Sequence, residues 1–495
     1  MSLSFALMNA ASGLRAQGRA AELVSGNVAN ALTPGYARRE LSLTTDVVGA
    51  NGGVRVAGVS RVVDPVVLAD RRVAEAAAGR TDVLAEAMKT IESAIGDPTE
   101  AGSLSARVAR FSAGLIEAGS QPGSELRLGQ AVAAARGLAE GINAVGDAVQ
   151  QMRTRADSAI GKLVAQVNAA VSQVDDLNDQ ILRLGAKARE SSSLQEARQQ
   201  AIDSIAEILP VREVARGNGS VSLFTADGAT LLDGRPRELA FTARGTVEPW
   251  MTREGGALSG LTIAGRPVDV LGDRSLLGDG SLRAQFELRD VAGPEAQAAI
   301  DALARDLVER FQDPALDPTL PAGPPPGPGL FTDGGGAFDG SPPAPAPPYP
   351  EEGLAQRLSV NSAVDPAAGG EVWRLRDGLG AVAAGAPGDS SLIVALSERL
   401  DAARAPLSGP QAGQARSFSD QAANFLSGIA TTRQAREDEA AFDRAQLEGY
   451  REAEAAGGVD TDDEMQKLLV IEQTYAANAR VIETIDTLMD RLTRI

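Results

Sequence analysis

The stretch from Leu3 to Tyr36 reads LSFALMNAASGLRAQGRAAELVSGNVANALTPGY, and it ends in an abrupt break of periodicity. Within it, apolar side chains recur at intervals of three and four residues, which is the spacing of one face of an amphipathic helix. The pattern predicts a helix from Leu3 to Leu32 that is buried along one stripe against another helix. Its two lines are Leu7, Leu14, Ala21 and Val28, and Leu3, Ala10, Gln17, Val24 and Ala31.

The break itself has a defined chemistry. Pro34 and Gly35 suit the two central positions of a type II turn, so Thr33-Pro34-Gly35-Tyr36 predicts a helix stop followed by a sharp change of direction. The side-chain amides of Asn27 and Asn30 are expected to bond free carbonyl groups at the end of the helix.

The other end of the chain repeats the heptad pattern, with Asn478 as its only polar member. Thr461 and Glu464 have the spacing of a capping box, in which the hydroxyl and carboxylate groups bond free amides of the first turn. A chain with such stripes at both ends is predicted to join or close something with them. The two lines are Leu468, Tyr475, Ile482 and Met489, and Ile471, Asn478, Ile485 and Leu492.

Composition excludes several classes of function. The 495 residues are too many for one compact core, and the net charge of −19 argues against binding to nucleic acid or anionic lipid. The chain has no histidine and no cysteine, which rules out serine-histidine triads, thiolate nucleophiles and the usual zinc sites. We expect no catalytic residue, cofactor or metal. Neither a long apolar run nor a basic residue before Arg15 is present, so we expect no spanning helix and no cleaved signal peptide.

The middle of the chain changes character several times. From Leu126 to Leu209 the pattern predicts a long helical coiled coil with one register shift near residue 156, and Pro210 stops it. Residues 211–290 predict a small β domain, with strand-like runs at Ser220–Thr225 and Ser281–Leu288. Its dipeptides Asn218-Gly219, Asp227-Gly228 and Asp233-Gly234 favour hairpin turns. Twelve prolines between Asp317 and Gly353 argue against a packed core and predict a mobile linker or surface loop.

These observations predict a mainly α fold with an inserted β domain, that is, an α+β multidomain chain. Residues 1–36 and 460–495 would be terminal helices that form an inner coiled-coil layer. Residues 37–210, 291–316 and 388–459 would form a long helical bundle, 211–290 the β-rich insertion, and 317–387 a Pro/Gly-rich linker and irregular region.

The segment Asn27-x-x-Asn30-x-x-Thr33-Pro34-Gly35-Tyr36, placed at the end of a first helix, resembles the N-terminal motif of bacterial flagellar axial proteins, the rod, hook and junction subunits. Residues 462–465 (DDEM) and 473–482 (QTYAANARVI) resemble the C-terminal helix of the same family. Between the ends, residues 58–61 (GVSR) with Asp64-Pro65, and 177–181 (LNDQI), are similar to a hook–filament junction subunit.

The resemblance implies a structural subunit, not an enzyme, that joins the hook to the filament. It implies export through the flagellar type III apparatus, so that the chain is cytoplasmic before export and then extracellular in the flagellum. The implied partners are other copies in a ring, the hook protein, the second hook–filament junction protein and an export chaperone on the helix from Met465 to Ile495. No nucleic acid and no membrane are implied.

We expect assembly to depend on one set of side chains and one turn. Because small and polar residues weaken an isolated helix pair, both ends are predicted to be disordered in the free monomer and to fold on assembly. The assembly residues are Leu3, Leu7, Leu14, Val24, Val28, Leu468, Ile471, Tyr475, Asn478, Ile482, Ile485, Met489 and Leu492, and the turn residues are Asn27, Asn30, Thr33, Pro34, Gly35 and Tyr36.

Two other functions stay open at this point. Another rod or hook subunit would differ mainly in its position along the axis, and the long helical pattern of the middle favours the junction. A carboxylate-based glycan hydrolase needs neither histidine nor cysteine, and it would draw on Asp227, Asp233, Glu238 or Asp269, although their spacing singles out no pair. The acids at 462–464 suit the dipole of a helix N-terminus and do not match a calcium loop.

Overall fold

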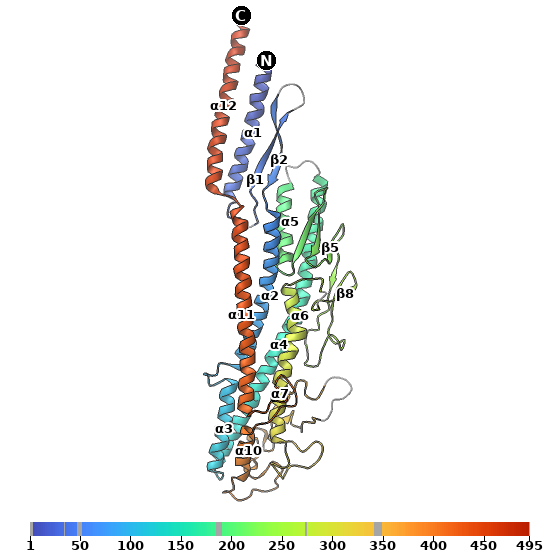
Figure 1. Cartoon of the computed structure of the whole chain (residues 1–495), viewed down its shortest axis with the longest axis vertical. Helices are drawn as coiled ribbons and strands as arrows, with labels where there is room; N and C mark the ends of the chain where they lie inside the picture. Colours follow the sequence, from blue (N-terminus) through green and yellow to red (C-terminus); the bar gives the residue numbers. More distant parts are fainter. Residues whose placement is uncertain are drawn as a thin grey trace.

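The computed structural model describes residues 3–33, 35–46, 52–184, 191–272, 275–340 and 349–494. Figure 1 shows an elongated molecule with both chain ends at its top and a long helical bundle below them. Small antiparallel sheets lie beside the bundle. The mainly α fold with a β insertion is therefore confirmed.

Two helices and a hairpin form the top of the molecule. Helix α1 (Leu3–Ala29) runs down from the N-terminus and helix α12 (Thr461–Thr493) runs up to the C-terminus, side by side (Figure 1). Strands β1 (Arg39–Asp46) and β2 (Gly53–Arg61) form an antiparallel hairpin that packs on α1.

Long helices form the bundle, and shorter elements complete its lower end. Helix α2 begins at Pro65, where the side chain of Asp64 accepts hydrogen bonds from the amides of Val66 and Val67 and so caps it. The bundle helices are α2 (Pro65–Ile95), α3 (Leu104–Ser120), α4 (Glu125–Leu184), α7 (Gly293–Phe311), α10 (Ser391–Asp401) and α11 (Phe418–Ala456).

The prediction of one continuous helix from Leu126 to Leu209 is wrong in its second part. Helix α4 ends at Leu184, and after a gap in the described residues α5 (Ser191–Ala206) packs back against α4. Ile202 of α5 and Val171 of α4 are buried in the same core. The apolar repeat continues past the break because both helices cover that core.

The β insertion contains two three-stranded antiparallel sheets. The glycines of the three predicted turn dipeptides, Gly219, Gly228 and Gly234, all have positive φ, as these turns require. The first sheet has the order β3 (Val211–Ala215), β4 (Val221–Thr225), β5 (Thr230–Leu232), and the second β6 (Leu239–Ala240), β7 (Leu261–Ile263), β8 (Arg266–Val268).

The strand predicted at Ser281–Leu288 is wrong, because this segment is helix α6 (Ser281–Glu287) followed by the π-helical turn η1 (Leu288–Ala292). Its apolar residues alternate because the helix lies between two cores. Leu282 and Phe286, four residues apart, are buried in the core of the β insertion. Ala284 and Leu288, also four apart, are buried in the core of the bundle.

The described part of the Pro/Gly-rich region is packed into the bundle, so the prediction of a linker over 317–387 is wrong there. The ring of Phe331 lies 5.5 Å from that of Phe111 and 5.4 Å from that of Phe311. Large apolar residues between the prolines supply this packing. Prolines 342, 343, 345, 347 and 348 lie outside the described residues. The region's elements are β9 (Phe331–Asp333), α8 (Leu354–Arg357), β10 (Leu358–Val360), η2 (Pro366–Ala368) and α9 (Arg374–Asp377).

A buried carboxyl group fastens this region to α7. The two carboxyl oxygens of Asp301 accept hydrogen bonds from the amides of Gly353 and Ala355, both at 2.8 Å. Burial raises the pKa of Asp301 from 3.8 to about 7 even though these hydrogen bonds oppose the shift.

The raised pKa of Asp301 predicts that stability depends on pH. The folded state keeps a proton that the unfolded chain releases near pH 3.8. The free energy of unfolding should therefore fall as the pH rises from about 4 to about 7, by up to about 4 kcal/mol. Urea unfolding at several pH values measures this fall. The Asp301→Asn variant should lack this component, and equal pH dependence in both proteins would contradict the prediction.

Candidate assembly site at the two ends of the chain

Two contacts define how the terminal helices pair. The missing side chain of Gly13 leaves room for Asn478, whose amide nitrogen lies 2.9 Å from where a Cβ atom of residue 13 would be. The side chain of Asn27 donates to Glu464 at 2.8 Å. Both steps, from 13 to 27 and from 464 to 478, span fourteen residues, so α1 and α12 are antiparallel in one continuous register.

The predicted assembly residues differ in how far the helix pair buries them. On α1, Val24 is buried, Leu3, Leu14 and Val28 are half-buried, and Leu7 is exposed. On α12, only Ile485 and Glu464 are buried. Of the predicted residues on α12, Leu468, Ile471, Asn478 and Ile482 are half-buried, and Tyr475, Met489 and Leu492 are exposed.

The helix pair therefore leaves much apolar surface in contact with solvent. Val470 and Leu492 of α12 are 60% and 59% exposed, and Met8 of α1 is 54% exposed. A single chain covers only one side of α12, and apolar surface of this extent on a paired helix marks an interaction site.

The polar centre of the site is Asn27, whose amide group makes four hydrogen bonds. Its nitrogen donates to Glu464 and, at 3.0 Å, to the carbonyl of Arg39. Its oxygen accepts from the amide of Arg39 at 3.0 Å and from the hydroxyl of Tyr36 at 2.9 Å. We call Asn27, Tyr36, Arg39 and Glu464 the Asn27 anchor. It joins the end of α1, the turn, the first strand and the start of α12.

The turn after α1 follows the prediction where it is described. The amide of Tyr36 donates to the carbonyl of Thr33 at 3.1 Å, and Gly35 has a φ of +76°, as the third position of a type II turn requires. Pro34 lies outside the described residues. Asn30 bonds a helix-end carbonyl, that of Gly26 at 2.9 Å, as predicted.

The predicted role of Asn27 as a helix-end cap is wrong, because its partners lie beyond the turn and on another helix. The capping box at Thr461 is also wrong. The N-cap of α12 is Asp460, whose carboxylate accepts from the amides of Asp462 and Asp463. Glu464 is then free to turn away from its own helix end, where it accepts from Asn27 and pairs with Lys467 at 2.7 Å.

The anchor also contacts α5, which packs on α4 of the bundle. The guanidinium of Arg39 lies 5.0 Å from the ring of Tyr36 and pairs with Glu196 of α5 at 2.7 Å. Burial raises the pKa of Tyr36 above its ordinary value of 10.0, so its hydroxyl remains a donor to Asn27. Sequence reasoning missed Glu196 and the role of Glu464, because these residues are 157 and 437 residues away from their partners Arg39 and Asn27. It missed Arg39 because this residue reaches Asn27 only after the turn brings β1 back to α1.

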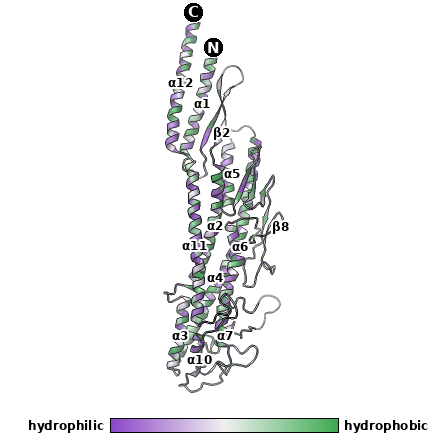
Figure 2. Cartoon of the chain, in the orientation of Figure 1, coloured by the Kyte–Doolittle hydropathy of each residue, from purple (hydrophilic) through white to green (hydrophobic). Residues whose placement is uncertain are grey.

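The position of α12 also depends on α11, the helix that precedes it in the chain and packs against α2. Below Ile429, α11 contributes Phe418, Ala422 and Phe425 to the bundle core, whereas above it only Ala440 and Leu447 are buried. Figure 2 shows this upper part in largely hydrophilic colours.

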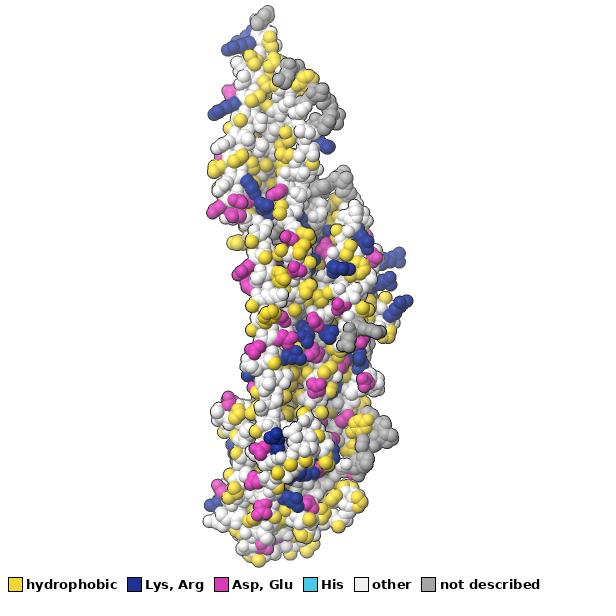
Figure 3. All heavy atoms as spheres, in the orientation of Figure 1, with side chains coloured by type: hydrophobic (Ala, Val, Ile, Leu, Met, Phe, Trp, Pro, Cys, Tyr) yellow, Lys and Arg dark blue, Asp and Glu magenta, His cyan; other side chains and the backbone are white. Residues whose placement is uncertain are grey.

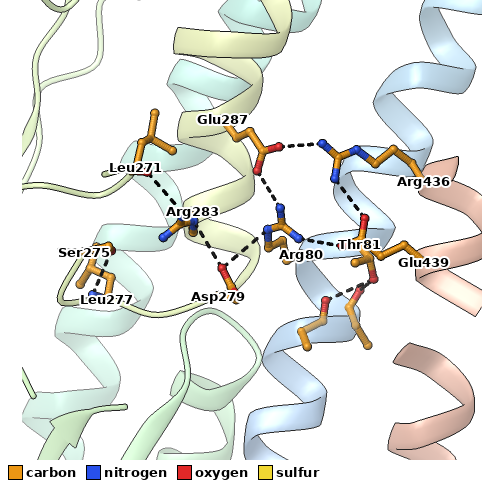
Figure 4. A network of polar contacts seen from close by, with 12 residues as sticks. Arg80, Thr81, Leu271, Ser275, Leu277, Asp279, Arg283, Glu287, Arg436 and Glu439 are labelled. Carbon is orange, nitrogen blue, oxygen red and sulfur yellow. Dashed lines mark hydrogen bonds and ion pairs between the residues drawn. The ribbon is translucent and has the colours of Figure 1, made fainter. Parts of the chain in front are cut away.

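Ion pairs hold the upper part of α11 in place. Arg80, Glu287, Arg436 and Glu439 form a closed ring of alternating charge with N–O distances of 3.0–3.1 Å, joining α2, α6 and α11 (Figure 4). Further pairs along α2 and α11 are Arg433–Glu92 (2.5 Å), Arg444–Asp82 (2.6 Å), Arg451–Glu75 (3.1 Å) and Arg71–Glu454 (2.7 Å).

This arrangement predicts that salt loosens one half of α11 and not the other. Raising salt from about 0.1 M to about 1 M shortens the screening length from about 10 Å to about 3 Å. Amide exchange over residues 433–456 should then quicken about tenfold, a change of about 1.4 kcal/mol. Residues 418–429, held by apolar contacts, serve as the internal control. Equal acceleration of both halves would show that the ion pairs do not hold the helix.

The residues considered for other chemistry do not form a site. Asp227, Asp233, Glu238 and Asp269 are all exposed. Asp233 pairs with Arg216, and Asp269 accepts from amides of its own loop. Within the described ranges, no three acidic side chains are grouped to hold a metal ion, and no described helix is long and apolar enough to cross a membrane.

Two models of known protein families match this chain, one at the terminal helix and one over the bundle and the β insertion. Residues 455–495 match the model of the flagellar basal body rod FlgEFG protein C-terminal region. Residues 88–314 match the helical domain of flagellar hook-associated protein FlgK. The first of these matches covers α12, and the second covers most of the bundle from α2 to α7 together with the β insertion.

Individual relatives agree with these matches. Flagellar hook-associated protein 1 of Salmonella typhimurium is 28% identical over 262 residues, covering 50% of this chain and 46% of that protein. The match thus spans about half the length of that relative. The proteins of the same name from Escherichia coli and Bacillus subtilis are 24% and 22% identical and cover 100% and 97% of this chain, and 100% and 96% of their own lengths.

A solved structure, that of the flagellar hook junction protein FlgK from Burkholderia pseudomallei, is 21% identical, with a TM-score of 0.43 over 53% of this chain and 46% of that chain. The two matching models are both of flagellar proteins. Over nearly its whole length, this chain is similar to flagellar hook-associated protein 1.

Proposed function

We propose that this chain is a structural subunit that joins the hook to the filament of the bacterial flagellum. The observation that carries the proposal is the Asn27 anchor, in which two ends 437 residues apart meet through a buried hydrogen bond. The paired helices it positions keep exposed apolar side chains such as Val470 and Met8. In a monomer this apolar surface would stay in contact with water, whereas in a tube of subunits it would be buried between neighbouring copies.

In this function, α1 and α12 form an inner coiled-coil layer, and the bundle makes contacts between neighbouring copies. The partners are other copies in a ring, the hook protein and the second hook–filament junction protein. Before export an export chaperone would cover α12, and the chain would pass from the cytoplasm to the outside through the type III apparatus. The disorder expected for both ends of the free monomer stays a prediction.

The alternatives receive less support. A rod or hook subunit would share the terminal helices, and the match to its C-terminal region covers only residues 455–495. A glycan hydrolase would need two carboxyl groups facing one cleft. The four candidate acids are exposed, and two of them are engaged in local contacts.

The test replaces two pairing residues with aspartate, Leu468→Asp and Ile485→Asp. Burial of a side chain such as Ile485 is worth about 1.5–3 kcal/mol, so the two charges should abolish incorporation into flagella. The measurement is the number of filaments on cells in which the variant is the only copy. The β insertion, whose core is shared with α4, α5 and α6 and contains no residue of the terminal helices, should keep its amide protection.

A matched control adds the same two charges at exposed polar positions of α12, Thr484→Asp and Thr487→Asp. These positions lie off the pairing stripe, so the control should lose fewer filaments than the test variant. Filaments of normal number on cells with the Leu468→Asp and Ile485→Asp protein would refute the proposed function.

A further inference from the structure

One edge of the β insertion is basic in an otherwise acidic molecule. Residues 211–290 contain ten arginines and eleven acids, whereas the whole chain has a net charge of −19. Arg235 and Arg237 lie in the connection from β5 to β6, and Arg266 begins β8. All three side chains are exposed, and none forms an ion pair with a described residue.

The backbone brings these arginines to the same edge. Strand β7 lies between β6 and β8, and Ile263 is paired with both Leu239 and Arg266. The amide of Ala264 donates to the carbonyl of Glu238 at 2.8 Å, which sets the turn of Arg266 next to the segment of Arg237. Figure 3 shows Lys and Arg side chains projecting from the right-hand edge of the molecule at this level. We call Arg235, Arg237 and Arg266 the basic edge.

The opposite edge of the molecule is acidic. Residues 437–463, the upper part of α11 and the start of α12, contain ten acids and two arginines. Glu448, Glu452, Asp462 and Asp463 are exposed and form no ion pair within the part of the chain that the structure describes. We call these four residues the acidic edge. In Figure 1, α11 lies at the left and the sheets of the insertion lie at the right.

We propose that the basic edge of one copy docks on the acidic edge of a second copy of this chain. Opposite charges on opposite sides of one molecule make a heterologous contact, in which each copy offers a different surface to each of its two neighbours. Repeating such a contact closes a ring or builds a helix. The inference rests on the proposed function, because it names the lateral contact of the assembled subunits.

Two features favour a copy of this chain over another partner. The acidic edge lies on the same molecule, so the complementary surface is present at equal concentration in any assembly. The upper part of α11 is also held by ion pairs that use its inner side, which leaves Glu448 and Glu452 available on the outside. Charge complementarity of this kind fixes register and suppresses wrong pairings.

The experiment uses two full-length charge-reversal variants. The first carries Arg235→Glu, Arg237→Glu and Arg266→Glu, and the second carries Glu448→Arg and Glu452→Arg. Self-association is measured by sedimentation equilibrium at low and high salt. Each variant alone should associate about tenfold more weakly than the natural chain, and a mixture of the two should associate again, because the reversed edges complement each other.

A control variant makes the same change of net charge elsewhere, with Lys89→Glu, Arg110→Glu and Arg155→Glu, all of which are exposed. It should associate like the natural chain. If the natural chain associates no more strongly than the first variant, the proposal is wrong. It is also wrong if the mixture of the two variants associates no better than each variant alone.

The two proposals fail in distinguishable ways. If the charge-reversal variants are incorporated into flagella as the natural chain is, the lateral contact proposed here is wrong and the junction function stands. If the Leu468→Asp and Ile485→Asp protein is incorporated, the junction mechanism itself is wrong, whatever the charged edges do.

Discussion

Replacement of Asn27 with alanine is expected to detach the two ends of the chain from each other. The variant loses four hydrogen bonds at once and leaves the carboxylate of Glu464, which is only 2% exposed, without its amide donor. Loss of one partner of a buried charged group costs about 3–5 kcal/mol in well-ordered sites. Lys467 remains at 2.7 Å from Glu464 and should keep the loss near the lower value.

The measurement is hydrogen exchange over residues 3–29 and 461–493 of the full chain, together with incorporation into flagella. Asn30→Ala is the matched control, because Asn30 has the same side chain in the same turn but donates to one local carbonyl, that of Gly26. The control should lose about 1 kcal/mol or less. If both variants behave alike, the anchor has no special role and the motif is only a helix stop.

Replacement of Arg289 with alanine is expected to loosen the β insertion from the bundle. The guanidinium is fully buried, pairs with Asp157 of α4 at 2.8 Å and with Asp290 at 2.7 Å, and donates to the carbonyl of Ser259 at 2.9 Å. The rings of Phe241 and Phe286 lie 5.3 and 5.0 Å from it. Its removal leaves Asp157 with an uncompensated charge, at a cost of about 3–5 kcal/mol.

Trp250 reports this change, because it lies in the insertion and the chain has only one other tryptophan, Trp373. In a Trp373→Phe background, urea unfolding followed by Trp250 fluorescence should shift to lower urea for Arg289→Ala. The control is Arg216→Ala in the same insertion, whose pair with Asp233 is exposed and should contribute less than about 1 kcal/mol. Equal shifts would show that Arg289 does not fix the insertion.

Sequence reasoning succeeded where a structure depends on residues close together in the chain. The heptad stripe from Leu3 to Leu32 placed α1, the glycines at 219, 228 and 234 placed three turns, and Thr33 to Tyr36 placed the turn after α1. These features follow from helical spacing and from the φ angles that glycine permits, so a few neighbouring residues contain the whole signal.

The predictions were wrong where one helix contributes side chains to two different cores. Leu282, Ala284, Phe286 and Leu288 alternate like a strand because α6 serves two cores, and no local rule separates that pattern from a sheet. The prediction of a linker in the Pro/Gly-rich region was wrong for a different reason. Proline excludes regular helix and strand there, but it does not prevent Phe331 from packing on Phe111 and Phe311.

The amino-acid sequence is enough to indicate the kind of protein, because it contains two amphipathic ends, a helical middle, a β insertion and neither histidine nor cysteine. How the two ends meet depends on the three-dimensional packing. Asn27 has four hydrogen-bonding positions and could have met them with water or with its own helix end. Its partners became Arg39, Tyr36 and Glu464 because Asp460 caps α12 and the turn brings the first strand back to α1. Spacing along the chain predicts which side chains share a helix face, but burial in three dimensions selects their partners.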